Sequence, residues 1–147
     1  MSKAQKFGLP FITAAMLLVT SVGAHAATPH HAAPAGTAPD PVVTALMTQA
    51  LADLPGKEGE MIIVDYPPGG ADPVHRHDAS AFVYVLQGSI VMQVKGGKEV
   101  TLTPGQTFYE GPDDVHIVGR NASQTEPAKF LAVLIKKQGA PALIPIK

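Results

Sequence analysis

Short apolar runs separated by turn residues make up most of the chain after residue 60. Within these runs apolar and polar positions alternate, which is typical of β-strands. Gly96-Gly97 predicts a two-residue hairpin turn. Turns this frequent, with no helices between the runs, predict an all-β antiparallel sandwich or barrel. The predicted strands are Met61 to Tyr66, Ala81 to Leu86, Ser89 to Lys95, Lys98 to Leu102, Thr107 to Glu110, Val115 to Val118, Lys129 to Lys136 and Leu143 to Ile146.

One segment ahead of these strands has a different period. Between Val42 and Leu54 the apolar residues recur at helical spacing, Asp40-Pro41 precedes them, and Pro55-Gly56 follows. An acidic residue and a proline before such a segment favour a helix start, and Pro-Gly favours its end. We therefore expect a short N-terminal helix from Val42 to Leu54, packed on the outside of the domain.

The first 26 residues have the pattern of a signal peptide. Lys3 and Lys6 give a positive start, Leu9 to Val22 is an uncharged apolar run, and Ala24-His25-Ala26 fits a cleavage site. The apolar run is short for a membrane span and contains Pro10, so a retained anchor is the weaker interpretation. We expect a periplasmic or secreted protein, with no membrane contact in its mature form.

The remainder of the chain divides into two parts. Residues 27–41 are mostly Ala, Pro and Thr with little to bury, which predicts a flexible leader. Residues 42–147 are long enough for one compact domain. The 11 basic and 12 acidic side chains give a net charge of −1, which gives no support for nucleic-acid binding. There is no cysteine, so any metal site must use nitrogen and oxygen ligands.

His75 and His77 are the main candidates for such a site. In an extended chain they project to one face and Arg76 to the other. His116 is the only other histidine after the leader. Three imidazoles can hold one metal ion, although strand histidines can also be ordinary hydrogen-bonded residues of a barrel.

These residues resemble the two motifs of the cupin family over Met61 to Ile135. The sequence is similar to small single-domain cupins of the conserved-barrel type, which implies a double-stranded β-helix, a jelly-roll barrel. The resemblance also implies one divalent metal (Fe, Mn, Zn, Ni or Cu) held by His75, His77 and His116, and a possible homodimer. The matching residues are Gly69, His75-Arg76-His77 and Gly88 in the first motif, and Gly111-Pro112, His116 and Asn121 in the second.

The chain departs from the family pattern at the metal-binding glutamate, whose place is taken by Ala81. The remaining ligand set is then three neutral imidazoles, which leaves more positions open for water or substrate. Four other acids can be considered as replacements, but their spacing places none of them clearly on the inner face. They are Asp78, Glu110, Asp113 and Asp114.

Two classes of function follow. The first is a metal-dependent enzyme acting on a small molecule, with oxygenase, isomerase or hydrolase chemistry left open and only Glu110 as a candidate general base. The second is a non-catalytic module that binds or senses a small ligand. Arg120 is a candidate partner for a substrate carboxylate. The aromatic residues are expected mainly in the core: Tyr66, Tyr84, Tyr109, Phe82 and Phe108.

Overall fold

The structure is a computed structural model that describes residues 37–146. The predicted signal peptide and residues 27–36 of the predicted leader lie outside the described residues. Residues 37–41 have no regular secondary structure, and the Pro39 carbonyl accepts a hydrogen bond from the Ala71 amide at 3.2 Å. Within the described residues no helix is long and apolar enough to cross a membrane.

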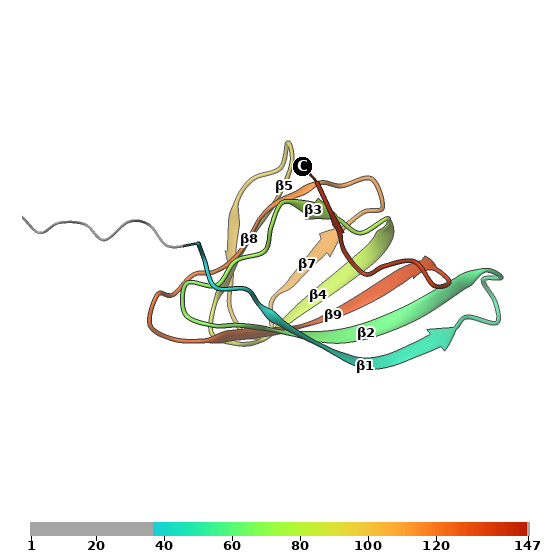
Figure 1. Ribbon diagram of the computed structural model, residues 1–147, viewed down its shortest axis with the longest axis horizontal. Helices are drawn as coiled ribbons and strands as arrows, with labels where there is room; N and C mark the ends of the chain where they lie inside the picture. The colour runs from blue at the N-terminus through green and yellow to red at the C-terminus, as the bar shows by residue number, and fades with distance from the viewer. Residues whose placement is uncertain (1–36, 147) are drawn as a thin grey trace, which may run out of the picture. The chain divides into compact units, whose positions relative to one another are not determined.

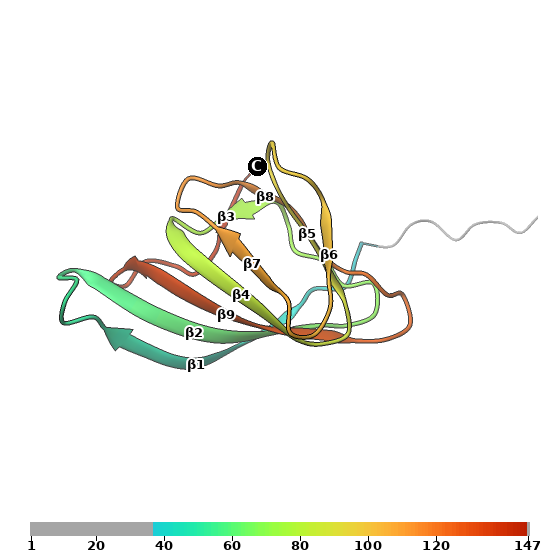
Figure 2. The same ribbon diagram turned by 180° about the vertical axis from the view of Figure 1, so that it is seen from behind.

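Over residues 37–146, ten strands form two five-stranded antiparallel sheets. Figures 1 and 2 show their arrangement from opposite sides. The first sheet has the order β1-β2-β9-β4-β7 and the second the order β10-β3-β8-β5-β6. Neighbours in each sheet come from distant parts of the sequence, as in a double-stranded β-helix, so the predicted all-β jelly-roll fold is confirmed. The bounds are β1 (Val42–Ala50), β2 (Lys57–Tyr66), β3 (His75–Arg76), β4 (Ala79–Gln87), β5 (Ile90–Val94), β6 (Val100–Leu102), β7 (Thr107–Glu110), β8 (His116–Asn121), β9 (Ala128–Lys137) and β10 (Ile144–Pro145).

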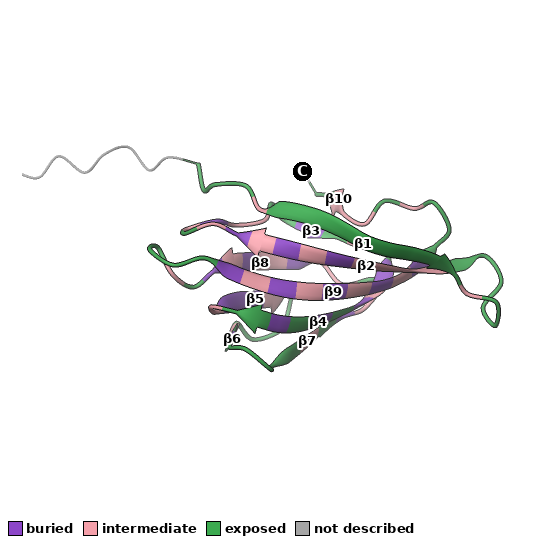
Figure 3. Cartoon of the chain, turned by 90° about the horizontal axis from the view of Figure 1, so that it is seen from below, coloured by how far each residue is buried: buried purple, intermediate pink, exposed green. Residues whose placement is uncertain are grey.

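The core lies between the two sheets. Buried residues alternate with less buried ones along β2 and β9, as Figure 3 shows, because successive side chains on a strand point to opposite faces. Val83, Phe130 and Leu134 of the first sheet belong to the same buried cluster as Ile90 and Met92 of the second. This alternation fixes which residues can reach the interior.

The predicted N-terminal helix is wrong. Residues 42–50 form β1, which pairs with β2 at the edge of the first sheet and is exposed along its whole length. An irregularity in the pairing between Ala45 and Met47 interrupts the two-residue period. Because the strand buries neither face, its apolar residues are not held to strict alternation, and their spacing resembled that of a helix.

The hairpin between β5 and β6 is also longer than expected. The strands pair from Ile90 opposite Leu102 to Met92 opposite Val100. Gly96 adopts a positive φ of 84°, and the Gly97 amide donates to the Val94 carbonyl at 2.9 Å. The turn therefore includes Gly96-Gly97 but extends beyond these two residues.

Candidate metal centre

Two of the candidate histidines face each other across neighbouring strands of the second sheet. His75 begins β3 and His116 begins β8, and they are paired residues in the ladder between these strands. Each is only 2% exposed. His75 Nε2 lies 3.4 Å from His116 Nδ1, so the pairing of β3 with β8 brings two imidazoles together.

His77 joins them from the residues that follow β3. Its Nε2 lies 3.1 Å from His75 Nε2, and the two rings meet edge to face at a centroid distance of 4.7 Å. Arg76 between them is exposed and pairs with Asp78 at 3.4 Å. The two histidines thus share one face and the arginine takes the other, as strand alternation predicts.

A fourth polar group comes from the opposite sheet. Glu110, the last residue of β7, is buried, and its Oε2 lies 3.4 Å from His77 Nε2 and 3.3 Å from His116 Nδ1. In the ladder between β4 and β7, Glu110 is the direct partner of Ala81. The carboxylate missing from position 81 is therefore supplied by the residue beside it on the next strand.

The expectation that no acid reaches the inner face is thus wrong for Glu110. One signal in the sequence could have found it. Phe108 packs against the core, and a residue two places further along a strand points to the same face. That alternation places Glu110 inside the barrel, whereas its register opposite Ala81 is fixed only by the fold.

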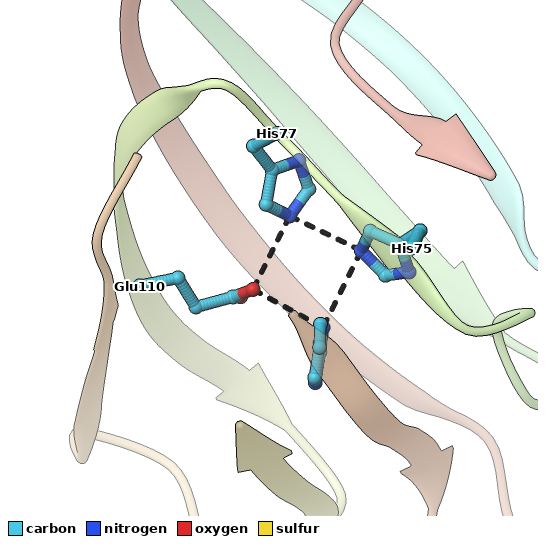
Figure 4. A group of neighbouring side chains, drawn as sticks. His75, His77 and Glu110 are labelled. Atoms are coloured by element: carbon cyan, nitrogen blue, oxygen red, sulfur yellow. Dashed lines mark hydrogen bonds and ion pairs between the residues drawn. The ribbon is translucent and has the colours of Figure 1, made fainter. Parts of the chain in front are cut away.

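The four donor atoms form a closed ring, drawn with dashed lines in Figure 4. Neighbouring atoms around the ring are 3.1 to 3.4 Å apart, and all four lie within 4.8 Å of one another. Ligands bound to one ion at about 2.0–2.2 Å stand roughly 3.0–3.5 Å apart. The distances between neighbouring donors therefore suit one metal ion, which the cluster could hold after small side-chain shifts that shorten the longer distances across the ring.

Two backbone carbonyls orient the rings of His75 and His77. His75 Nδ1 lies 2.8 Å from the Pro73 carbonyl, and His77 Nδ1 lies 2.5 Å from the Ala142 carbonyl. A carbonyl only accepts, so each Nδ1 carries the proton and each Nε2 presents a lone pair to the cluster. This arrangement is the usual support for a metal-binding histidine.

Two buried atoms of the cluster have no hydrogen-bond partner among the described residues: Glu110 Oε2 and His116 Nε2. An unpaired carboxylate oxygen in the interior is costly, whereas an ion inside the ring compensates its charge. The lack of a partner at Glu110 Oε2 is what a cation between these donors would explain.

The electrostatics of the cluster favour an ionised Glu110, neutral rings at His75 and His116, and a more basic ring at His77. Burial lowers the pKa of His75 and of His116. Burial also acts against the protonated ring of His77, but Glu110 and the Ala142 carbonyl outweigh it and raise its pKa. Burial opposes ionisation of Glu110, yet the surrounding histidines outweigh it and lower the pKa of that carboxyl. An anionic Glu110 can therefore offset part of a cation's charge.

The remaining candidates lie elsewhere. Asp114 accepts a hydrogen bond from the Gly111 amide at 2.7 Å within a turn, and Arg120 pairs with Glu99 at 3.6 Å on the surface. Tyr66 is buried in the core, as expected, and Phe108 packs against it. The expectation of a core position is wrong for the other three aromatics, which are 45 to 53% exposed: Phe82, Tyr84 and Tyr109.

Comparison with protein families agrees with this geometry. Residues 62–134 match the cupin domain. This segment is a cupin domain. No curated protein matches the chain at a significant level.

Solved structures share the fold. A cupin domain from Bordetella pertussis Tohama I is 22% identical with a TM-score of 0.54, over 69% of this chain and 98% of that one. Oxalate oxidase in complex with the substrate analogue glycolate is 23% identical with a TM-score of 0.54, over 72% of this chain and 55% of that one. A DMSP lyase from Ruegeria pomeroyi is 21% identical with a TM-score of 0.52, over 59% of this chain and 42% of that one. This chain thus spans about half the length of either enzyme. At these identities the likeness concerns the fold.

Proposed function

We propose that the cupin domain binds one divalent metal ion through His75, His77, Glu110 and His116, and acts on a small molecule inside the barrel. The observation that carries the proposal is the buried ring of four donors, in which Glu110 Oε2 has no other partner. Fold alone does not fix the reaction, because cupin neighbours include both a lyase and an oxidase.

Each residue has a distinct part in holding the ion. His75 and His77 present Nε2 with the tautomer fixed by the Pro73 and Ala142 carbonyls. His116 presents Nδ1, and Glu110 supplies the negative charge that three imidazoles lack. Four protein donors leave room for further ligands on a five- or six-coordinate ion.

Held by these four residues, a divalent ion would supply Lewis acidity toward a carbonyl oxygen or a bound water. The surrounding residues contribute by excluding bulk water, since the cavity next to the cluster is lined mainly by apolar side chains of the first sheet such as Val64, Val83 and Leu134. Electrostatic interactions inside such a wall are stronger than in water.

The decisive experiment is metal analysis of the purified protein. The protein is either isolated after export or refolded in the presence of a mixture of divalent ions. We expect one equivalent of metal in the native chain and a small fraction of that in His77→Ala, a partly exposed residue whose removal should leave the fold intact. The matched control is His30→Ala with His31→Ala, which removes two histidines of the predicted leader and should keep the full equivalent. Equal, substoichiometric metal in all three proteins would refute the site.

The alternative is a module that binds or senses a small ligand without turnover. Screening small molecules for turnover and for binding by the metal-loaded protein distinguishes the enzyme from the binding module, and the chelated protein is the control. Turnover that disappears on chelation supports the enzyme, whereas ligand affinity that survives removal of the metal supports the binding module.

The N-terminal pattern supports the further proposal that the protein is exported, to the periplasm or outside the cell. Its support is the positive start, the apolar run to Val22 and the Ala24-His25-Ala26 site. N-terminal sequencing of the mature protein should begin at Ala27. A mature chain that still begins at Met1 would contradict export by this route.

A further inference from the structure

The cavity beside the four donors is small. Its volume is about 70 Å³, and its walls include Val64, Val83, Phe130 and Leu134. A single water needs about 10–15 Å³ of such space. A ligand of roughly five or six non-hydrogen atoms is therefore the largest that fits without movement of the walls.

One polar side chain of the wall lies outside the donor cluster. Asp72 lines the cavity, and its Oδ2 accepts a hydrogen bond from the hydroxyl of Tyr66, which is buried. The Asp72 amide donates to the Gly119 carbonyl at 2.8 Å. Burial, together with the nearby Asp72, raises the pKa of Tyr66, so the phenol stays protonated and keeps donating. Burial also raises the pKa of Asp72, while the hydrogen bond from Tyr66 and the nearby His116 act in the opposite direction and favour the ionised carboxyl. Hydrogen bonds to both the side chain and the backbone of Asp72 thus fix the position of its carboxyl group.

Gly119 shows how closely these groups approach the donor cluster. A Cβ at this position would stand 2.9 Å from Asp72 Oδ2, 2.9 Å from His116 Cε1 and 3.1 Å from the Tyr66 hydroxyl. Any side chain there would push the carboxyl away from the histidine. The absence of one lets Asp72 and Tyr66 lie next to a proposed metal ligand.

The wall provides no fixed positive charge to balance these acids. Asp72 and Glu110 both line the cavity, while no lysine or arginine does so among the described residues. Arg76 and Arg120 pair with Asp78 and Glu99 at the surface. A ligand carboxylate bound to the metal ion would therefore lie beside Asp72 with no basic side chain between them, in a low-dielectric space where like charges repel strongly.

We propose that Asp72, held in place by Tyr66, determines the specificity of this cavity by accepting a hydrogen bond from a small uncharged or cationic ligand and by disfavouring carboxylates. The inference rests on the proposed function, since the ligand would sit against the bound metal. It assigns this chain a substrate class different from oxalate, although oxalate oxidase shares its fold.

The test compares glycolamide with glycolate, which have the same number of non-hydrogen atoms and differ in charge. Dissociation constants of both are measured by calorimetry on the metal-loaded protein. Because carboxylates bind metals better than amides in any site, the measured quantity is the ratio of the two constants in each variant. Asp72→Asn keeps the size of the side chain and removes its charge.

We expect Asp72→Asn to shift the ratio toward glycolate by at least about tenfold. Asp65→Asn, on the outer face of β2, is the matched control and should leave the ratio unchanged. Tyr66→Phe removes the hydrogen bond that holds the Asp72 carboxyl at the cavity wall. The carboxyl can then move away from the ligand, so the ratio should shift in the same direction by a smaller factor. This variant provides a second reading if Asp72→Asn unfolds.

Three results would overturn the inference. A ratio that stays within about twofold in both cavity variants would show that Asp72 does not discriminate. A metal-loaded protein that binds neither probe would show that the cavity does not take ligands of this size. A chain that takes up no metal would overturn the proposed function as well, so the two failures are distinguishable.

Discussion

Strands β4 and β7 present two different surfaces from neighbouring residues. Ala81 and Glu110 are partners in their ladder and point into the barrel, where Glu110 meets the histidines. One residue along, Phe82 and Tyr109 are partners that point outward, with ring centroids 5.2 Å apart. The same backbone therefore carries a buried carboxylate on one face and exposed aromatics on the other, which reverses the usual distribution.

The difference shows what each face requires. Inside, a small residue at position 81 leaves space that the carboxylate of Glu110 occupies. Outside, Phe82 continues a row of apolar partners across the sheet through Val133 and Met61. Such a row on a surface is typical of a contact with another molecule. The unusual residue on each face is thus a guide to function, whereas the ordinary core residues are a guide to stability.

The largest effect is expected for a core residue of the inner face. Phe130→Ala should lower the free energy of unfolding by about 3–5 kcal/mol, because it removes a buried ring and leaves a cavity. Phe82→Ala, on the exposed face, should cost at most about 1 kcal/mol, mainly from its pair with Tyr109. Urea unfolding of the metal-free proteins measures both. Equal losses would show that Phe82 is buried against something in solution.

The next effect concerns metal affinity. Glu110→Gln keeps the shape of the side chain and removes its charge, so affinity should fall by about 100-fold or more, given that outer partners of metal ligands alone contribute about 10–100-fold. Competition with a chromophoric chelator gives the constant. Glu99→Gln, in an exposed ion pair with Arg120, is the control and should bind as tightly as the native chain. Unchanged affinity in Glu110→Gln would remove the carboxylate from the site.

A third experiment moves the carboxylate back to the family position. Cβ atoms of directly opposed residues are about 4.5–5.5 Å apart, a distance that a glutamate side chain can span. Ala81→Glu in a Glu110→Ala background should therefore regain at least about tenfold of the lost affinity. If affinity does not recover, a carboxylate at position 81 cannot reach the metal ion, and only the position of Glu110 on β7 supplies this ligand.

The smallest effect on the site is expected from the outer face. Phe82→Ser with Tyr109→Ser should leave metal affinity within about twofold, since both side chains point away from the cluster. The same variant tests the predicted homodimer. If copies pair through this face, sedimentation should show a dimer in the native chain and a monomer in the variant. A dimer in both would place the contact elsewhere.

The sequence predicted the barrel and three of the four clustered donors, because both depend on local patterns. Alternation marks the strands, and His75 and His77 share a face by spacing alone. Glu110 was considered as a replacement ligand and as a general base, but the sequence did not place it beside the histidines. Its position opposite Ala81 depends on the register between β4 and β7, which are distant in the sequence. The prediction of a helix from Val42 was wrong for a related reason, namely that the pattern of this segment is not constrained by burial. An edge strand that buries nothing has no constraint on its pattern.

The contact between Asp72 and Tyr66 was not predicted either, because like the position of Glu110 it depends on the folded arrangement. Each belongs to a different kind of segment, Tyr66 to the end of β2 and Asp72 to the loop that follows it. Their approach to His116 depends on the space left by Gly119. Contacts set by a missing side chain leave no positive signal in a single sequence.

The support of His77 by the Ala142 carbonyl has a consequence for the last residues of the chain. Residues 142–146 also hold β3, through the pairing of Ile144 with Arg76 and the hydrogen bond from the Ile146 amide to the Val74 carbonyl at 2.9 Å. The position of this segment and the orientation of the His77 ring are therefore coupled, and a metal ion bound by His77 would stabilise the contacts of the segment. Substitutions in residues 142–146 that weaken these contacts should therefore loosen the orientation of His77 within the donor cluster.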